Sequence, residues 1–103
     1  MSYAGMVVLE SAIDIVVITK NTSTVPTAAT GSVTYRVYGD GTLMTNGTGS
    51  LSALDSSNVT GGYRVAISAL AADGYAAGEN YQVVVQATVS GNAWSEVVNF
   101  TVV

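Results

Sequence analysis

The chain has no cysteine and no histidine, and only three basic residues stand against seven acidic ones, for a net charge of −4. The missing Cys and His exclude disulfides, thiol nucleophiles, zinc centres and His-based catalytic triads. So few basic side chains cannot neutralise a phosphate backbone, and we expect no nucleic-acid partner. The apolar runs at residues 6–9 and 15–18 are too short for a membrane span, which needs about 20 residues.

The residues that are abundant favour β-structure. The 103 residues, enough for one domain, include 17 Val, 12 Thr, 4 Ile and 8 aromatic residues. Apolar and polar side chains alternate in several segments; between residues 33 and 38, Val33, Tyr35 and Val37 share one face. Asp40-Gly41 and Asn46-Gly47 each match a two-residue hairpin turn. The chain therefore reads as an all-β domain.

The turn signals divide the chain into about seven short strands, which we place at residues 12–19, 33–38, 42–45, 50–54, 63–70, 81–89 and 94–102. Strands with one apolar face form antiparallel sheets, and two such sheets packed together form a β-sandwich. We expect residues 12–103 to make this sandwich and residues 1–11 to be an N-terminal arm or an extra strand. A small barrel fits the same pattern.

No constellation in the sequence indicates catalysis. The seven carboxylates are scattered, and three of them lie in expected turns, where Asp commonly binds nearby backbone amides. Residues 39–42 (GDGT) lack the Lys and the following helix of a phosphate-binding loop, and read as a hairpin. We expect no enzymatic activity, no metal and no cofactor.

Apolar residues at outward-facing positions are the candidate contact site. They occur in the N-terminal arm, in the first strand and in the last two strands, at Met6, Val7, Val8, Leu9, Val16, Ile18, Val84 and Val97. Several apolar side chains on one face indicate a covered face. The cover is either the N-terminal segment of the same chain or another subunit, as in a homo-oligomer, and the sequence leaves both open.

The order of several motifs carries a family resemblance. These are YRVY and GDG at 35–41, TGGY at 60–63, GYAAGENY at 74–81 and NFTV at 99–102. Together they make residues 12–103 resemble the small immunoglobulin-like or fibronectin-like β-sandwich modules found as structural proteins of tailed bacteriophages. Within that likeness Tyr81 resembles a tyrosine corner, whose hydroxyl bonds a backbone group in the preceding loop. The chain lacks the Cys pair and the central Trp of an antibody-type domain.

The resemblance implies a virion protein that works by binding. A chain that begins with Met and holds one module reads as a complete gene product, made in the cytoplasm of the host bacterium. The function it favours is capsid decoration: binding the major capsid protein on the outside of the assembled head. Two alternatives stay open. One is a tail, neck or fibre component, and the other is a host-surface or glycan-binding module using Tyr3, Tyr38, Tyr75 and Trp94.

Overall fold

A computed structural model describes residues 2–103. Over these residues the chain forms seven β-strands and one short 3-10 helix: β1 (Ser2–Val7), β2 (Ala12–Ile18), β3 (Thr30–Gly39), β4 (Thr42–Ala53), β5 (Gly62–Ser68), η1 (Ala71–Asp73), β6 (Asn80–Val89) and β7 (Asn92–Val102). The expected all-β class is confirmed. No helix in this part of the chain is long and apolar enough to cross a membrane.

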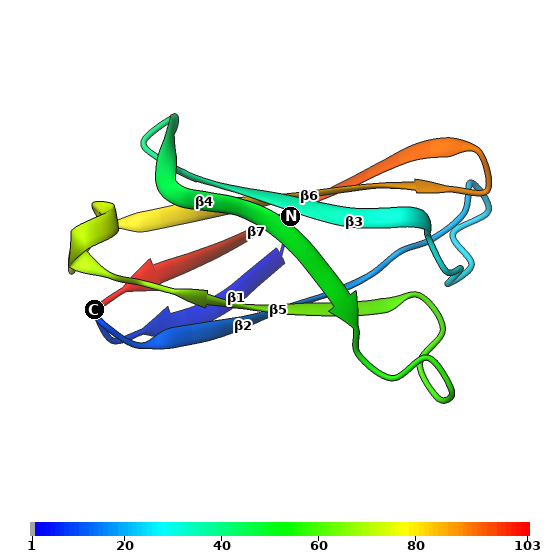
Figure 1. The fold of residues 1–103 in the computed structure, drawn as a ribbon, viewed down its shortest axis with the longest axis horizontal. Helices are drawn as coiled ribbons and strands as arrows, with labels where there is room; N and C mark the ends of the chain where they lie inside the picture. Colours follow the sequence, from blue (N-terminus) through cyan, green and yellow to red (C-terminus); the bar gives the residue numbers. More distant parts are fainter. Residues whose placement is uncertain (1) are drawn as a thin grey trace.

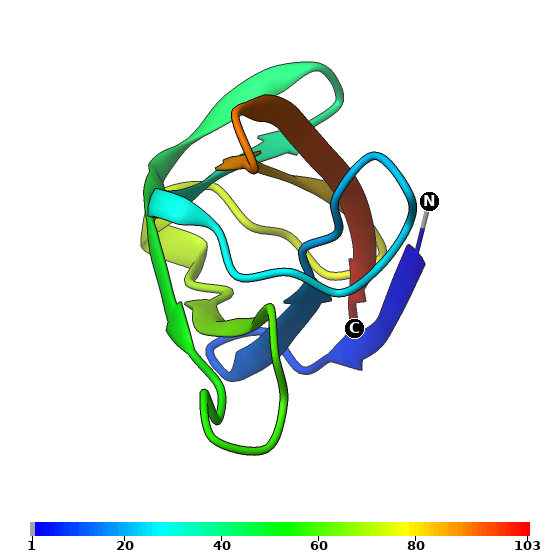
Figure 2. The same cartoon turned by 90° about the vertical axis from the view of Figure 1, so that its right-hand side faces the viewer.

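The strands form one nearly closed sheet in the order β1-β7-β6-β3-β4-β5-β2. β4 pairs with β3 along most of its length and then with β5 at its end, where Ser52 faces Arg64. The two end strands, β1 and β2, follow each other in the chain through the turn at residues 8–11. Figure 1 shows β3, β4 and β6 above β1, β2 and β5, and Figure 2 shows the strands end-on as an incomplete ring.

One strand pair departs from the antiparallel arrangement of the others. β1 runs parallel to β7, with Met6 beside Thr101 and Val7 beside Val102. The antiparallel pairing was expected for the strands of residues 12–103, and the pairs among these strands are antiparallel. The turn at residues 8–11 carries the chain across to β2, and β1 pairs with the last strand instead of with its successor. The sheet is mixed, and residues 1–11 include a true strand.

The two predicted hairpin turns have different outcomes. Asp40 and Gly41 have φ of 52° and 79° and connect β3 to β4 in a two-residue turn, as predicted. Asn46-Gly47 forms no second turn. Asn46 has φ of 57°, but it lies inside β4, where the register against β3 shifts between Arg36 and Tyr38. A left-handed residue also suits a bulge, and the two strands expected at 42–45 and 50–54 are one.

The core fills the space enclosed by the sheet. Val37, Val83, Val85 and Phe100 are completely buried, from the three strands β3, β6 and β7. Ile15 of β2 is also completely buried. These positions alternate with more accessible ones along each strand, which is the period-two pattern that the sequence showed. Three aromatic rings cluster at one end of this core, with the ring centroids of Tyr75 and Tyr81 4.7 Å apart and those of Tyr81 and Phe100 5.5 Å apart.

Candidate functional site

Exposed apolar side chains gather where β1 leaves the sheet. Met6 is 69% exposed and Val8 62%. Val103, 48% exposed, lies beside Val8, because its N–H donates to the carbonyl of Val7 and its carbonyl accepts from the N–H of Leu9. Met6, Val8 and Val103 are called the edge patch below. Met6 and Val8 are among the contact residues expected from the sequence; Val103 is not, although the alternation of β7 could have indicated it.

The other two residues of the predicted arm face inwards. Val7 is only 6% exposed and belongs to the core, so its inclusion in a contact surface does not hold for this fold. Leu9 is half-buried and packs against the same core. The N-terminal segment is therefore anchored by alternate side chains, which leaves Met6, on the edge strand β1, and Val8, just after it, to project outward.

The remaining candidates lie on two different surfaces. Val16 is 48% exposed on β2 and faces Arg64 of β5, whose guanidinium pairs with the Asp14 carboxylate. Val84 and Val97 are half-buried neighbours across β6 and β7. The structure does not unite these residues with the edge patch.

Ile18 and Val97 share a shallow cavity at the side of the molecule. This cavity of about 330 Å³ is also lined by Lys20, Trp94 and Glu96. The Trp94 side chain packs partly against the core, so only part of it faces the cavity. The side chains here combine one positive charge, one negative charge and apolar groups, so the cavity favours no single class of ligand.

The tyrosines named in the sequence analysis have separate environments. The Tyr81 hydroxyl accepts a hydrogen bond of 2.8 Å from the backbone N–H of Ala76 in the preceding loop. Tyr75 is 4% exposed, and burial, followed by the nearby Asp73 charge, raises its pKa to about 12. It cannot serve as a surface platform for a sugar. Tyr3 is 59% exposed and lines a large polar hollow.

Two of the carboxylates, Asp55 and Asp73, accept hydrogen bonds from asparagine side chains. Asp55 accepts hydrogen bonds from the side chain and backbone N–H of Asn58, and the side-chain bond lowers the Asp55 pKa. Asp73 accepts from the Asn46 amide at 2.9 Å. Within residues 2–103 no three acidic side chains lie close enough together to hold a metal ion. Their geometry fits turn and loop stabilisation.

Comparisons of the chain with protein-family models, curated proteins and solved structures found no match. Its function is therefore inferred from the surfaces described above and from the motif resemblance.

Proposed function

We propose that this protein is a non-enzymatic structural protein of a tailed-phage virion that decorates the outside of the assembled head. It would be made in the cytoplasm of the bacterial host and would bind the major capsid protein. The observation that carries the proposal is the edge patch, three apolar side chains exposed where β1, at the border of the sheet, and its neighbour β7 end. The assignment to a phage particle rests on the motif resemblance.

The edge patch suits a protein contact for a physical reason. Apolar side chains that project together into water gain about 25 cal/mol for each Å² that a partner covers. Edge strands are also the part of a sheet that neighbouring chains contact most readily. A protein that binds only the assembled shell favours that state by mass action, which is how decoration would strengthen a head.

The same proposal includes the finer description of the fold as an immunoglobulin-like sandwich. Support comes from the strand pairing: within the single sheet β4 pairs with β5 at only two positions, which divides the strands into one group of β1, β7, β6, β3 and β4 and another of β5 and β2. The hydrogen bond between Tyr81 and the loop before β6 also fits a tyrosine corner. β4 connects the two groups by changing partners within its length.

The location of the protein in an intact particle tests the proposal directly. Cryo-electron microscopy of the phage that carries this gene should show many copies on the outside of the head. The edge patch should lie against the capsid surface. A few copies on the tail axis or on fibres would replace decoration by the tail alternative, and absence from the particle would refute both.

Binding to shells tests the edge patch itself. The double variant Met6→Asp/Val8→Asp should reduce co-sedimentation with undecorated shells at least tenfold. Both side chains are mostly exposed, so the melting temperature should change little. Val25→Asp is the matched control: Val25 is 53% exposed in the loop between β2 and β3, and Figure 1 shows that loop at the end of the molecule opposite the C-terminus. Equal binding by the double variant and the control would refute this contact.

A further inference from the structure

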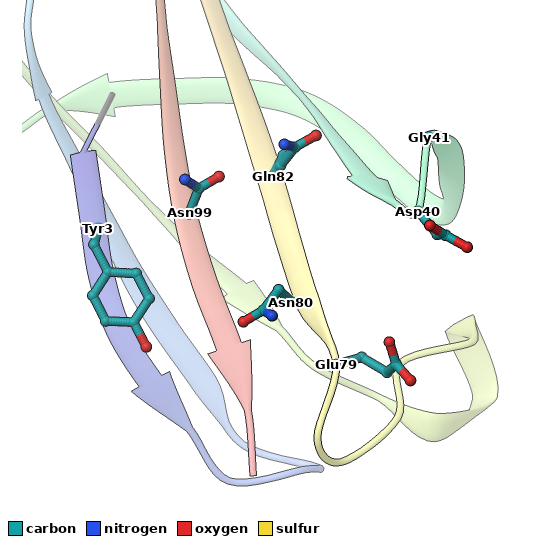
Figure 3. A pocket seen from close by; sticks show the side chains of 7 residues that line it. All are labelled: Tyr3, Asp40, Gly41, Glu79, Asn80, Gln82 and Asn99. Carbon is teal, nitrogen blue, oxygen red and sulfur yellow. The ribbon is translucent and has the colours of Figure 1, made fainter.

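A polar hollow lies on the outer face of the sheet, next to the turn between β3 and β4. Its volume is about 580 Å³, within the range of about 300–1,000 Å³ typical of small-molecule sites. Its lining comes from three strands, one turn and one loop: Tyr3, Asp40, Gly41, Glu79, Asn80, Gln82 and Asn99 (Figure 3). No residue of the edge patch is among them.

Strand register places three of these side chains in one row. Tyr3 of β1 lies beside Asn99 of β7, and Asn99 lies beside Gln82 of β6. Neighbouring strands are about 4.8 Å apart, so the row is about 10 Å wide. The Tyr3 ring therefore stands at one side of the hollow, and the amides of Asn99 and Gln82 form its floor. The width of this row suits one or two sugar rings.

Hydrogen bonds fix part of this lining before any ligand binds. The Tyr3 hydroxyl donates to Thr101 Oγ1 at 3.0 Å, and Thr101 Oγ1 donates to Asn80 Oδ1 at 2.6 Å. The first bond holds the Tyr3 ring against the sheet. The second occupies the carbonyl oxygen of the Asn80 amide and leaves its NH₂ group as the donor. Groups held in advance lose less entropy when a ligand binds.

The charges select the class of ligand. Asp40 and Glu79 supply carboxylate oxygens, which only accept hydrogen bonds, and none of the lining residues is basic. Phosphates, sulfates and acidic sugars would meet uncompensated negative charge. A ligand with many hydroxyl donors and apolar C–H faces matches the carboxylates, the amides and the exposed Tyr3 ring together. Two carboxylates are too few for the acidic cluster that a metal site needs, and residues 2–103 contain no such cluster.

We propose that this hollow, called the polar hollow below, is a binding site for a neutral saccharide. Tyr3 packs against a C–H face of the sugar, while Asp40 and Glu79 accept from its hydroxyls. Asn80, Gln82 and Asn99 orient it through their amides. The site does not depend on decoration, because it shares no side chain with the edge patch.

The test is a titration of the ¹⁵N-labelled protein with neutral saccharides, using glucose, galactose, mannose, N-acetylglucosamine and their linear trisaccharides. At least one should shift the backbone signals of Tyr3, Gly41 and Gln82 saturably, with a Kd of about 1 mM or tighter, as for a small site with few contacts. No saturable shift at these residues with any of the sugars would overturn the proposal. Saturable shifts caused by calcium and by none of the sugars would overturn it as well.

Variants of two glutamines on β6 distinguish binding in the polar hollow from binding elsewhere on the surface. Gln82→Ala should weaken saccharide binding at least tenfold, whereas Gln86→Ala should leave it unchanged. Gln86 is exposed on the same strand and the same face, but it does not line the polar hollow. Equal affinity of both variants would refute the assignment. The Met6→Asp/Val8→Asp variant should keep saccharide binding, so failure of the shell contact and failure of this site are distinguishable.

Discussion

The hydroxyl of Tyr81, at the start of β6, accepts a hydrogen bond of 2.8 Å from the backbone N–H of Ala76, five residues earlier. Tyr81 itself is 4% exposed, and its ring packs against Tyr75 and Phe100. The bond therefore joins the loop after η1 to the aromatic end of the core. The same loop leads into Glu79 and Asn80 of the polar hollow, so Tyr81 also fixes one of its walls.

Removing that hydroxyl should destabilise the fold without creating a cavity. Tyr81→Phe leaves the part-buried N–H of Ala76 without its acceptor, at a cost of about 1–2 kcal/mol in the free energy of unfolding. Urea denaturation measures the change. Tyr3→Phe is the control, since the Tyr3 hydroxyl bond is exposed and its loss should cost less than about 0.5 kcal/mol. Equal losses would show that the loop does not depend on Tyr81.

The sequence predicted the all-β class and the β3–β4 turn because both depend on neighbouring residues. Alternation over residues 33–38 and the Asp40-Gly41 pair are local signals. Asn46-Gly47 carries the same local signal and yet lies inside β4, where the register against β3 shifts. A positive φ is satisfied by either structure, and pairing with β3 across the sheet decides between them.

Which residues form the candidate sites depends more on contacts between residues that are far apart in the sequence. Val7 and Met6 are adjacent, and only the pairing of β1 with β7 determines which one enters the core. Val103 joins the edge patch through hydrogen bonds to residues almost a full chain length away. The row of Tyr3, Asn99 and Gln82 has the same origin, so no sequence motif could have revealed the polar hollow.

Thr19 should be the most costly hydroxyl to remove from the region after β2. It is completely buried, and its hydroxyl donates to the carbonyl of Thr27, with the Gly61 carbonyl at 3.3 Å. Thr19→Val keeps the shape but leaves these carbonyls without the donor, and should cost about 1–2 kcal/mol in chemical denaturation. Thr34→Val on the exposed face of β3 should change stability by less than about 0.5 kcal/mol. A neutral Thr19→Val variant would contradict this role.

Gly61 should tolerate a methyl group less well than another glycine of similar conformation. Its φ is +76°, and a Cβ there would lie 2.8 Å from the Thr19 carbonyl oxygen and 2.9 Å from that of Thr27. Gly91 has φ of +80° with open space around it. Gly91→Ala should cost about 1–2 kcal/mol from the left-handed backbone alone, and Gly61→Ala clearly more. Similar melting temperatures for the two variants would show that the Gly61 contacts relax freely.

Tyr75 should make the fold sensitive to strongly alkaline pH. Its pKa is raised to about 12 by burial and by the Asp73 charge, whereas an unfolded tyrosine ionises near pH 10. The unfolded state therefore loses its proton first, and the stabilisation present below pH 10 falls as the pH rises from 10 to 12. Tyr75→Phe removes this contribution, so its denaturation midpoint should fall less steeply over that range than the wild type's. Parallel pH profiles would contradict the raised pKa.

β1 should stabilise its own chain through Val7 while Met6 contributes almost nothing. Val7 is 6% exposed in the core and Met6 is 69% exposed on the outer face. Val7→Ala should therefore cost about 2 kcal/mol in unfolding free energy, and Met6→Ala less than about 0.5 kcal/mol. Because β1 pairs with β7 of the same chain, the melting temperature should not depend on protein concentration. A melting temperature that rises with concentration would indicate that the strand is exchanged between copies, and the edge patch would then lie at their junction.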